Sequence, residues 1–130
     1  MKDQSLRKFR GTLAAVAASA LLWGAPVAAQ NTIKIGMITD KVGAAKAYAE
    51  PVAAGAIYAV KELNAKGGIL GRQIELQVED DQAKPDVSAT MARKLVDAGA
   101  VFILSVSLTP ATQQAQAVTK ETKTPHITPS

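Results

Sequence analysis

From about residue 32, segments whose apolar side chains recur every second residue alternate along the chain with segments whose apolar side chains recur about every 3.6 residues. Residues 32–39 and 74–79 alternate apolar and polar side chains, which is typical of β-strands with one polar face. Residues 50–65 instead repeat apolar side chains with a period of about 3.6, which predicts an amphipathic helix. Residues 101–106 form an almost unbroken apolar run, as expected for a strand buried on both faces of a parallel sheet.

Proline residues mark the starts of the predicted helices. Pro51, Pro85 and Pro110 each fit a first helical turn, because the N–H that proline lacks is not needed there. We therefore expect residues 40–50 to be a loop and further helices to begin near Pro85 and Pro110, followed by a short strand at 126–128. The expected inner positions of these two helices are Ser88, Met91, Ala92, Leu95 and Val96, and then Ala111, Ala115 and Val118.

Residues 64–72, N-A-K-G-G-I-L-G-R, link the first predicted helix to the second strand. Gly67 is expected just past the helix end, where a positive φ is usual, and Gly68 and Gly71 allow two further turns. The glycines close a helix, whereas a phosphate-binding loop follows a strand and opens a helix. The sequence therefore favours a structural turn over a nucleotide site.

The predicted elements follow the order βαβαβαβ. Right-handed crossovers then produce an α/β fold, a parallel, doubly wound, Rossmann-like sheet with helices on both faces. Ligands of such sheets lie at the carboxyl ends of the strands, next to helix N-termini. This rule selects the loops at residues 39–50, 80–85 and 107–111, and a fourth segment after residue 128.

Residues 1–29 have the layout of a secretory signal peptide. A basic start precedes an apolar run at residues 13–23, which is too short to span a bilayer. Small residues at 27–29, ending at Ala29, then fit a signal-peptidase cleavage site. We expect a signal helix that is cleaved after Ala29; an N-terminal anchor or a buried helix is the alternative. Residues 30–130 would then be the mature chain.

Composition narrows the possible functions. The chain has a net charge of +4, but residues 1–29 hold four basic residues and one acid, so the remainder is close to +1 and nucleic acid is not an expected partner. With no cysteine, neither a disulfide nor a thiolate nucleophile can form. We expect a released protein, because the cysteine that a lipoprotein needs is also missing.

The loop at residues 107–111 is the most informative candidate site. Thr109 is expected at a helix N-cap, with the N–H groups of Ala111 and Thr112 behind it. Such a helix start can hold a carboxylate or another anion. An ordinary N-cap without a ligand explains the same residues, and the residues alone leave both explanations open.

Enzyme chemistry has little support in the sequence. Asp80 and Asp81 form a carboxylate pair, but no third ligand or base has a recognisable spacing, so loop hydrogen bonding is the favoured explanation. His126 is the only histidine, and Ser105 and Ser107 lack the strand-turn-helix context of a nucleophile. We predict no metal site, no cofactor and no catalytic activity.

A family resemblance rests on the run at residues 64–72, followed by Asp80-Asp81, by Pro85 and by A-R-K-L-V at residues 92–96. Together these motifs resemble the first lobe of periplasmic leucine/isoleucine/valine-type solute-binding proteins. Those proteins are the substrate receptors of branched-chain amino-acid ATP-binding-cassette importers. The resemblance covers residues 32–130 and implies the N-terminal lobe of a type I periplasmic binding fold. The family has two lobes, so we expect residues 30–130 to be an incomplete solute-binding domain.

The resemblance also implies roles for individual residues. Thr109 matches a hydroxyl residue that helps to bind the ligand's carboxylate, next to the N–H of Ala111. Tyr48, in the first loop, matches a tyrosine that lines the ligand cleft, unless it is only an exposed aromatic or packs onto the helix. Ser130 falls where the family offers backbone groups to the ligand. Pro110 departs from the family pattern and leaves the solute open.

The resemblance implies a periplasmic receptor that delivers an amino acid or a related carboxylated solute to the permease and ATPase subunits of an importer. A periplasmic sensor or regulator is the alternative, and neighbouring genes for a kinase rather than a permease would favour it. We expect the full-length protein to be monomeric. The 130-residue chain alone is expected to bind weakly or not at all.

Overall fold

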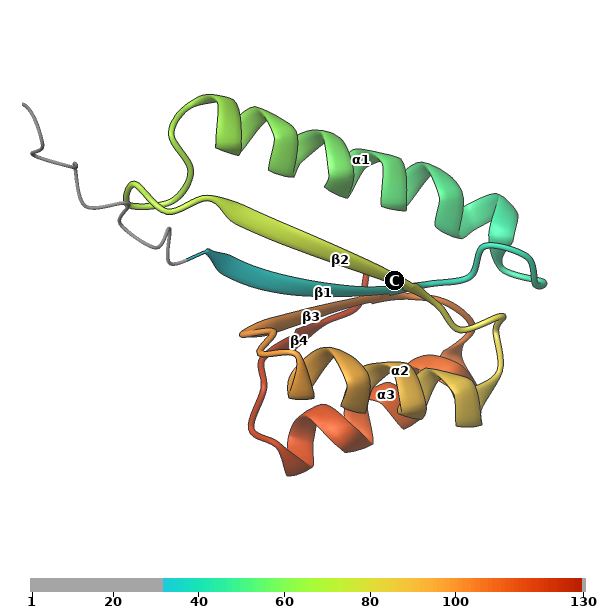
Figure 1. The fold of residues 1–130 in the computed structure, drawn as a ribbon. Coiled ribbons are helices and arrows are strands. Elements are labelled where there is room, and N and C mark those ends of the chain that lie inside the picture. Colours follow the sequence, from blue (N-terminus) through green and yellow to red (C-terminus); the bar gives the residue numbers. More distant parts are fainter. Residues whose placement is uncertain (1–31, 130) are drawn as a thin grey trace, which may run out of the picture.

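The computed structural model describes residues 32–129, so the predicted signal peptide and Ser130 lie outside the described residues. Strands and helices alternate in the predicted order (Figure 1). The elements are β1 (Ile33–Thr39), α1 (Lys46–Ala65), β2 (Ile74–Asp80), α2 (Pro85–Asp97), β3 (Phe102–Val106), α3 (Thr109–Glu121) and β4 (His126–Ile127).

The four strands form one parallel sheet in the order β2-β1-β3-β4. Helix α1 covers one face of the sheet, and α2 and α3 lie side by side on the other (Figure 1). The predicted doubly wound arrangement is confirmed. Among the described helices, none is both long enough and apolar enough to cross a lipid bilayer.

The hydrophobic core is divided by the sheet into two clusters. Met37 on β1 packs beneath α1 with Ala49 and Val106, whereas its neighbour Ile38 packs toward α2 and α3. This alternation follows from the period of two along a strand. The cluster on the side of α2 and α3 contains Ile38, Ala92, Leu95, Ile103, Ala115 and Val118. The predicted inner faces of α2 and α3 are therefore largely confirmed.

The start of α1 differs from the prediction. The helix begins at Lys46, and Pro51 lies inside it rather than in its first turn. The buried Asp40 carboxylate accepts N–H groups from Val42 and Ala45, which orders the approach to the helix and allows it to start early. Pro51 removes the N–H that would bond to the carbonyl of Ala47, but Ala47 is exposed and water can take that place.

The glycine-rich turn after α1 is built as the sequence indicates. Gly67 and Gly68 both have positive φ, and a Cβ on Gly68 would stand 1.9 Å from the carbonyl oxygen of Arg72. The Asn64 side chain then pairs with the backbone of Ile74, donating to its carbonyl at 2.8 Å and accepting its N–H at 2.7 Å. The end of α1 is thereby joined to the start of β2.

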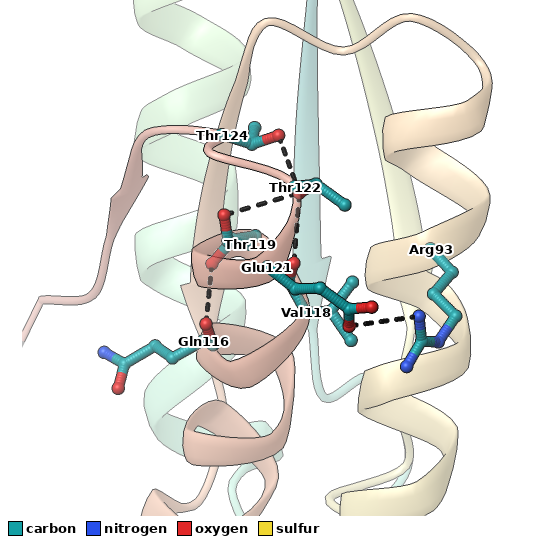
Figure 2. Close-up of polar contacts among 7 residues, drawn as sticks. All are labelled: Arg93, Gln116, Val118, Thr119, Glu121, Thr122 and Thr124. Atoms are coloured by element: carbon teal, nitrogen blue, oxygen red, sulfur yellow. Dashed lines mark hydrogen bonds and ion pairs between the residues drawn. The ribbon is translucent and has the colours of Figure 1, made fainter.

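Helices α2 and α3 are linked at their surface by an ion pair between Arg93 and Glu121, at 3.6 Å (Figure 2). Helix α3 ends in threonine contacts, in which the Thr122 hydroxyl donates to the carbonyl of Val118 at 3.0 Å (Figure 2). The Thr124 N–H donates to the carbonyl of Thr119 at 2.8 Å. These bonds turn the chain into β4.

Candidate functional site

The carboxyl ends of β1, β2 and β3 align at one edge of the sheet. Thr39 pairs with Asp80 on one side and with Val106 on the other. The alignment continues past the strands, because Asp81 N–H donates to the carbonyl of Thr39 at 3.1 Å. The three loops that the topology rule selected therefore leave the sheet together, and we refer to this region as the carboxyl edge.

The N-terminus of α3 opens at the carboxyl edge, one residue earlier than predicted. Leu108, with an extended backbone, is the N-cap, and Thr109 is the first helical residue, so the N-cap prediction for Thr109 is wrong. Thr112 N–H donates to the carbonyl of Leu108 at 3.0 Å, so the prediction that this N–H is free for a ligand is wrong. Because Pro110 has no N–H, Thr109 and Ala111 supply the amides that precede the first intrahelical bond.

Thr109 and Ala111 differ in what they can offer to a ligand. Thr109 is exposed, so both its hydroxyl and its N–H can reach a molecule at the edge. Ala111 is 0% exposed as a whole residue, so its backbone N–H is covered as well as its side chain. Thr109 therefore places its hydroxyl and its N–H at a helix N-terminus, where the dipole favours negative charge, and the N–H of Ala111 lies beneath them.

Tyr48 lies in the first turn of α1, not in the predicted loop. Its hydroxyl donates to the carbonyl of Pro129 at 3.1 Å, and the residue is half exposed. Pro129 follows β4, which pairs with β3, so Tyr48 and Thr109 belong to the same edge of the sheet. Ser130, the remaining predicted site residue, follows Pro129 and lies outside the described residues.

Asp40 is a site residue that sequence reasoning missed. Its carboxylate is 1% exposed and accepts three backbone N–H groups, from Val42, Gly43 and Ala45. The signal was an aspartate directly after a predicted strand and shortly before a glycine, a pattern that favours side chain to backbone bonds in a turn. Asp40 therefore holds the loop between β1 and α1 in shape.

Asp80 and Asp81 form loop hydrogen bonds, as the sequence favoured. Asp80 accepts the N–H groups of Lys41 and Gln82. Asp81 Oδ1 accepts the N–H of Ala83 and the hydroxyl of Ser107, both at 3.0 Å. The bond to Ser107 joins the loop after β2 to the loop that opens α3.

His126 lies away from the carboxyl edge, between β3 and α3. Its Nε2 is 2.7 Å from the Ser105 hydroxyl, and its Nδ1 is 3.0 Å from the Thr119 hydroxyl. Burial lowers the pKa of His126. Since Ser105 is fully buried, this serine–histidine contact is part of the core and is not an exposed nucleophile.

Comparison with known proteins supports one family. Residues 32–130 match a family model described as periplasmic binding protein. A Leu/Ile/Val-binding protein, BraC3, of Rhizobium johnstonii is 39% identical over 93 residues, which are 72% of this chain and 25% of that protein. A leucine-, isoleucine-, valine-, threonine- and alanine-binding protein of Pseudomonas aeruginosa is 31% identical over 78% of this chain and 27% of its own length.

The fold agrees with solved structures. The branched-chain amino acid transporter substrate binding protein LivJ of Streptococcus pneumoniae, in complex with isoleucine, matches with a TM-score of 0.73 and 34% identity. The match covers 76% of this chain and 29% of that structure, so the chain spans between a quarter and a third of the length of these relatives. On the family match, the sequence identities and the shared fold, the chain belongs to the periplasmic binding protein family and has the type I fold.

Proposed function

We propose that the chain forms the N-terminal lobe of a periplasmic receptor that binds a small carboxylated solute, an amino acid or a related acid, and delivers it to an ATP-binding-cassette importer. The observation that carries this proposal is the shared carboxyl edge, where the N-terminus of α3 and the Tyr48 hydroxyl lie at neighbouring strand exits. The relatives, which are named as leucine-, isoleucine- and valine-binding proteins, support the amino-acid class.

The chemistry of binding follows from the donors at that edge. The hydroxyl and the N–H of Thr109 would hold the solute's carboxylate, and the N–H of Ala111 would join them only once the start of α3 opens. Hydrogen bonds to a charged group contribute about 1.5–3 kcal/mol each. Pro110 supplies no donor, so this lobe offers fewer amides than a helix start without proline. The Tyr48 hydroxyl would close one side of the site while it remains bonded to Pro129.

A second lobe would supply the rest of the cleft, because the chain spans 25% to 29% of its relatives. Hinge closure of two lobes around the solute is the standard motion of this class, and the permease would recognise the closed form. The partners are then the solute and the permease and ATPase subunits. The function is binding without catalysis, by a monomer in the periplasm.

The experiment is a thermal-shift panel on the full-length protein, with amino acids, amides and small carboxylic acids as probes. A solute at about a hundred times its Kd should add about 2.7 kcal/mol to the free energy of unfolding. Thr109→Val, which removes one hydroxyl, should weaken the Kd of that solute about tenfold. The matched control is Thr90→Val on the exposed side of α2, which should leave the Kd unchanged. If no probe shifts the transition, the receptor proposal fails.

A further inference from the structure

Three carboxylates meet at the carboxyl edge of the sheet. Asp40, after β1, and Asp80 and Asp81, at the end of β2, each offer an oxygen, and these atoms lie within 4.8 Å of one another. Asp40 is 1% exposed, Asp81 is 0% exposed and Asp80 is half-buried. The third carboxylate, which the spacing of Asp80 and Asp81 could not reveal, comes from a neighbouring parallel strand.

Within residues 32–129, no ion pair to a basic side chain balances this charge. Among residues 32–129, the ion pairs are Lys66–Glu62, Arg93–Glu121 and Lys94–Glu79, and none includes Asp40, Asp80 or Asp81. Backbone N–H groups bond to the three side chains, but they carry only partial charges. Like charges at this separation repel, and the repulsion is strong where water is largely excluded.

A second observation points to a bound ligand. Oδ1 of Asp81 accepts two hydrogen bonds, but Oδ2 is buried and has no partner. The Thr39 hydroxyl, at the position that pairs with Asp80, is also buried without a partner. A buried polar atom left unpaired is destabilising, and more so when it is charged. A cation among these oxygens would satisfy Asp81 Oδ2 and balance the cluster.

We propose that Asp40, Asp80 and Asp81 bind one calcium ion. Ca²⁺ takes oxygen ligands at about 2.3–2.6 Å in flexible geometry, so oxygens on opposite sides of the ion stand about 4.8 Å apart. Mg²⁺ requires a near-ideal octahedron, keeps several waters and is usually held by one or two carboxylates. Three carboxylates within 4.8 Å of one another, two of them buried, therefore favour Ca²⁺.

The hydrogen bonds leave room for the ion. In Asp80 and Asp81 the loop bonds all go to Oδ1, so the second oxygen of each carboxylate is available. Both oxygens of Asp40 accept backbone N–H groups, but Oδ2 accepts only that of Ala45 and keeps a lone pair for the ion. The ion would tie the end of β1 to the end of β2. Through the bond from Ser107 to Asp81, it would also steady the loop that opens α3. Its role is structural and does not depend on which solute the protein binds.

The test begins with the purified full-length protein, freed of metal with a chelator. Isothermal titration with CaCl₂ should show one ion per chain. Saturation at about a hundred times the Kd should raise the Tm by roughly 3–5 °C, and MgCl₂ or NaCl at matched ionic strength should do much less. If titration with CaCl₂ gives no heat of binding, the proposed site is excluded. Equal Tm shifts with all three salts would indicate screening of surface charge only and would also exclude it.

Variants locate the ion. Asp81→Asn and Asp80→Asn keep the side-chain size and should each weaken the Kd for Ca²⁺ at least tenfold. Asp86→Asn, an exposed acid in the first turn of α2, is the matched control and should bind Ca²⁺ like the wild type. If Asp81→Asn does not fold, the half-buried Asp80→Asn variant decides. Equal Ca²⁺ affinity in Asp80→Asn and Asp86→Asn would exclude the proposed site.

Discussion

At the scale of single residues, the hydroxyl groups beside His126 determine where its proton lies. The Thr119 hydroxyl donates its hydrogen to the carbonyl of Gln116 at 3.1 Å, so it accepts from His126 Nδ1 (Figure 2 shows the Thr119–Gln116 bond). Nε2 of the neutral ring is then free to accept the Ser105 hydroxyl. Protonation of Nε2 would reverse this bond, since the Ser105 oxygen would then have to accept, and would place a charge in the core.

The histidine makes stability depend on pH. Burial lowers the pKa of His126, so the unfolded chain takes up a proton at higher pH than the folded protein does. The contribution of His126 is complete above its ordinary pKa of about 6.5 and is lost as the pH falls below it, with a slope of at most about 1.4 kcal/mol per pH unit. Urea unfolding between pH 5 and pH 8 measures this, with His126→Gln as the reference. Parallel curves for the two proteins would contradict the prediction.

The site residues show what a sequence can reveal at this scale. Thr109 could be placed at the start of α3 because proline marks first turns, but not as N-cap or first residue, since that depends on the backbone of Leu108. Asp40 was recognisable only as a turn former. Its position beside Asp80 depends on strand register, which no local pattern contains.

At the scale of elements, the link from α1 to β2 contains an unfavourable residue. Leu70 has a φ of 52° and is 96% exposed, and Gly71 follows with a φ of 76°. Ile69 and Arg72 exchange two backbone hydrogen bonds across them, so positive φ is required at both central positions, as in a type I′ turn. Leucine is disfavoured in this conformation, and its side chain gains no burial there.

Leu70→Asn should therefore stabilise the protein by about 0.5–1 kcal/mol, because asparagine tolerates positive φ and Asn-Gly is the preferred pair for this turn. Chemical denaturation measures the change in the free energy of unfolding. Ile69→Asn is the matched control, since Ile69 has no positive φ and is partly covered; it should give no gain. A loss in Leu70→Asn as large as that in Ile69→Asn would refute the explanation.

Helix α2 takes part in two ion pairs that can be compared: Lys94 pairs with Glu79 on β2, and Arg93 pairs with Glu121 on α3. A hydrogen bond from Gln77 lowers the pKa of Glu79, and the bond from Lys94 at 2.9 Å lowers it further. The stability that Glu79 contributes is thus present above its ordinary pKa and is lost as the pH falls through the lowered value. Lys94 pairs with a mostly covered carboxylate, whereas both partners of Arg93–Glu121 are exposed.

Lys94→Met should cost about 0.5–1 kcal/mol at pH 7, and Arg93→Met less than about 0.3 kcal/mol, because water screens the exposed pair more strongly. Urea titrations at low salt would measure both changes in the free energy of unfolding. At pH 3 the difference between Lys94→Met and wild type should shrink, as Glu79 becomes protonated. Equal costs for the two variants at pH 7 would show that the burial of Glu79 is unimportant.

At the scale of the whole molecule, the proposed export signal defines where the mature protein starts. Cleavage after Ala29 should give a chain that begins at Gln30, shortly before β1. N-terminal sequencing of the exported protein measures this directly. Ala29→Phe should accumulate the uncleaved precursor, because the position before the cut requires a small side chain. A mature protein that still begins at Met1 would exclude the signal peptide.

The carboxyl edge was predictable at this scale because it follows from topology alone. Alternating strands and helices with short links force a parallel sheet, and a parallel sheet has one edge where ligands bind. Two features were not predictable: the proximity of the Asp40 carboxylate to those of Asp80 and Asp81, and the hydrogen bond from the Tyr48 hydroxyl to the carbonyl of Pro129. Both join residues that are distant in sequence, and only the packed structure shows them.

The central place of β1 has a consequence for the timing of folding. Its two partners both lie farther along the chain: β2 is reached across α1, and β3 only across α1, β2 and α2. A chain that emerges with its N-terminus first cannot begin the sheet by itself, because long-range pairing must wait for those later segments and is slow. If the protein is secreted as proposed, the segment that contains β1 would therefore still be unfolded when it reaches the translocation pore, as passage through the pore requires.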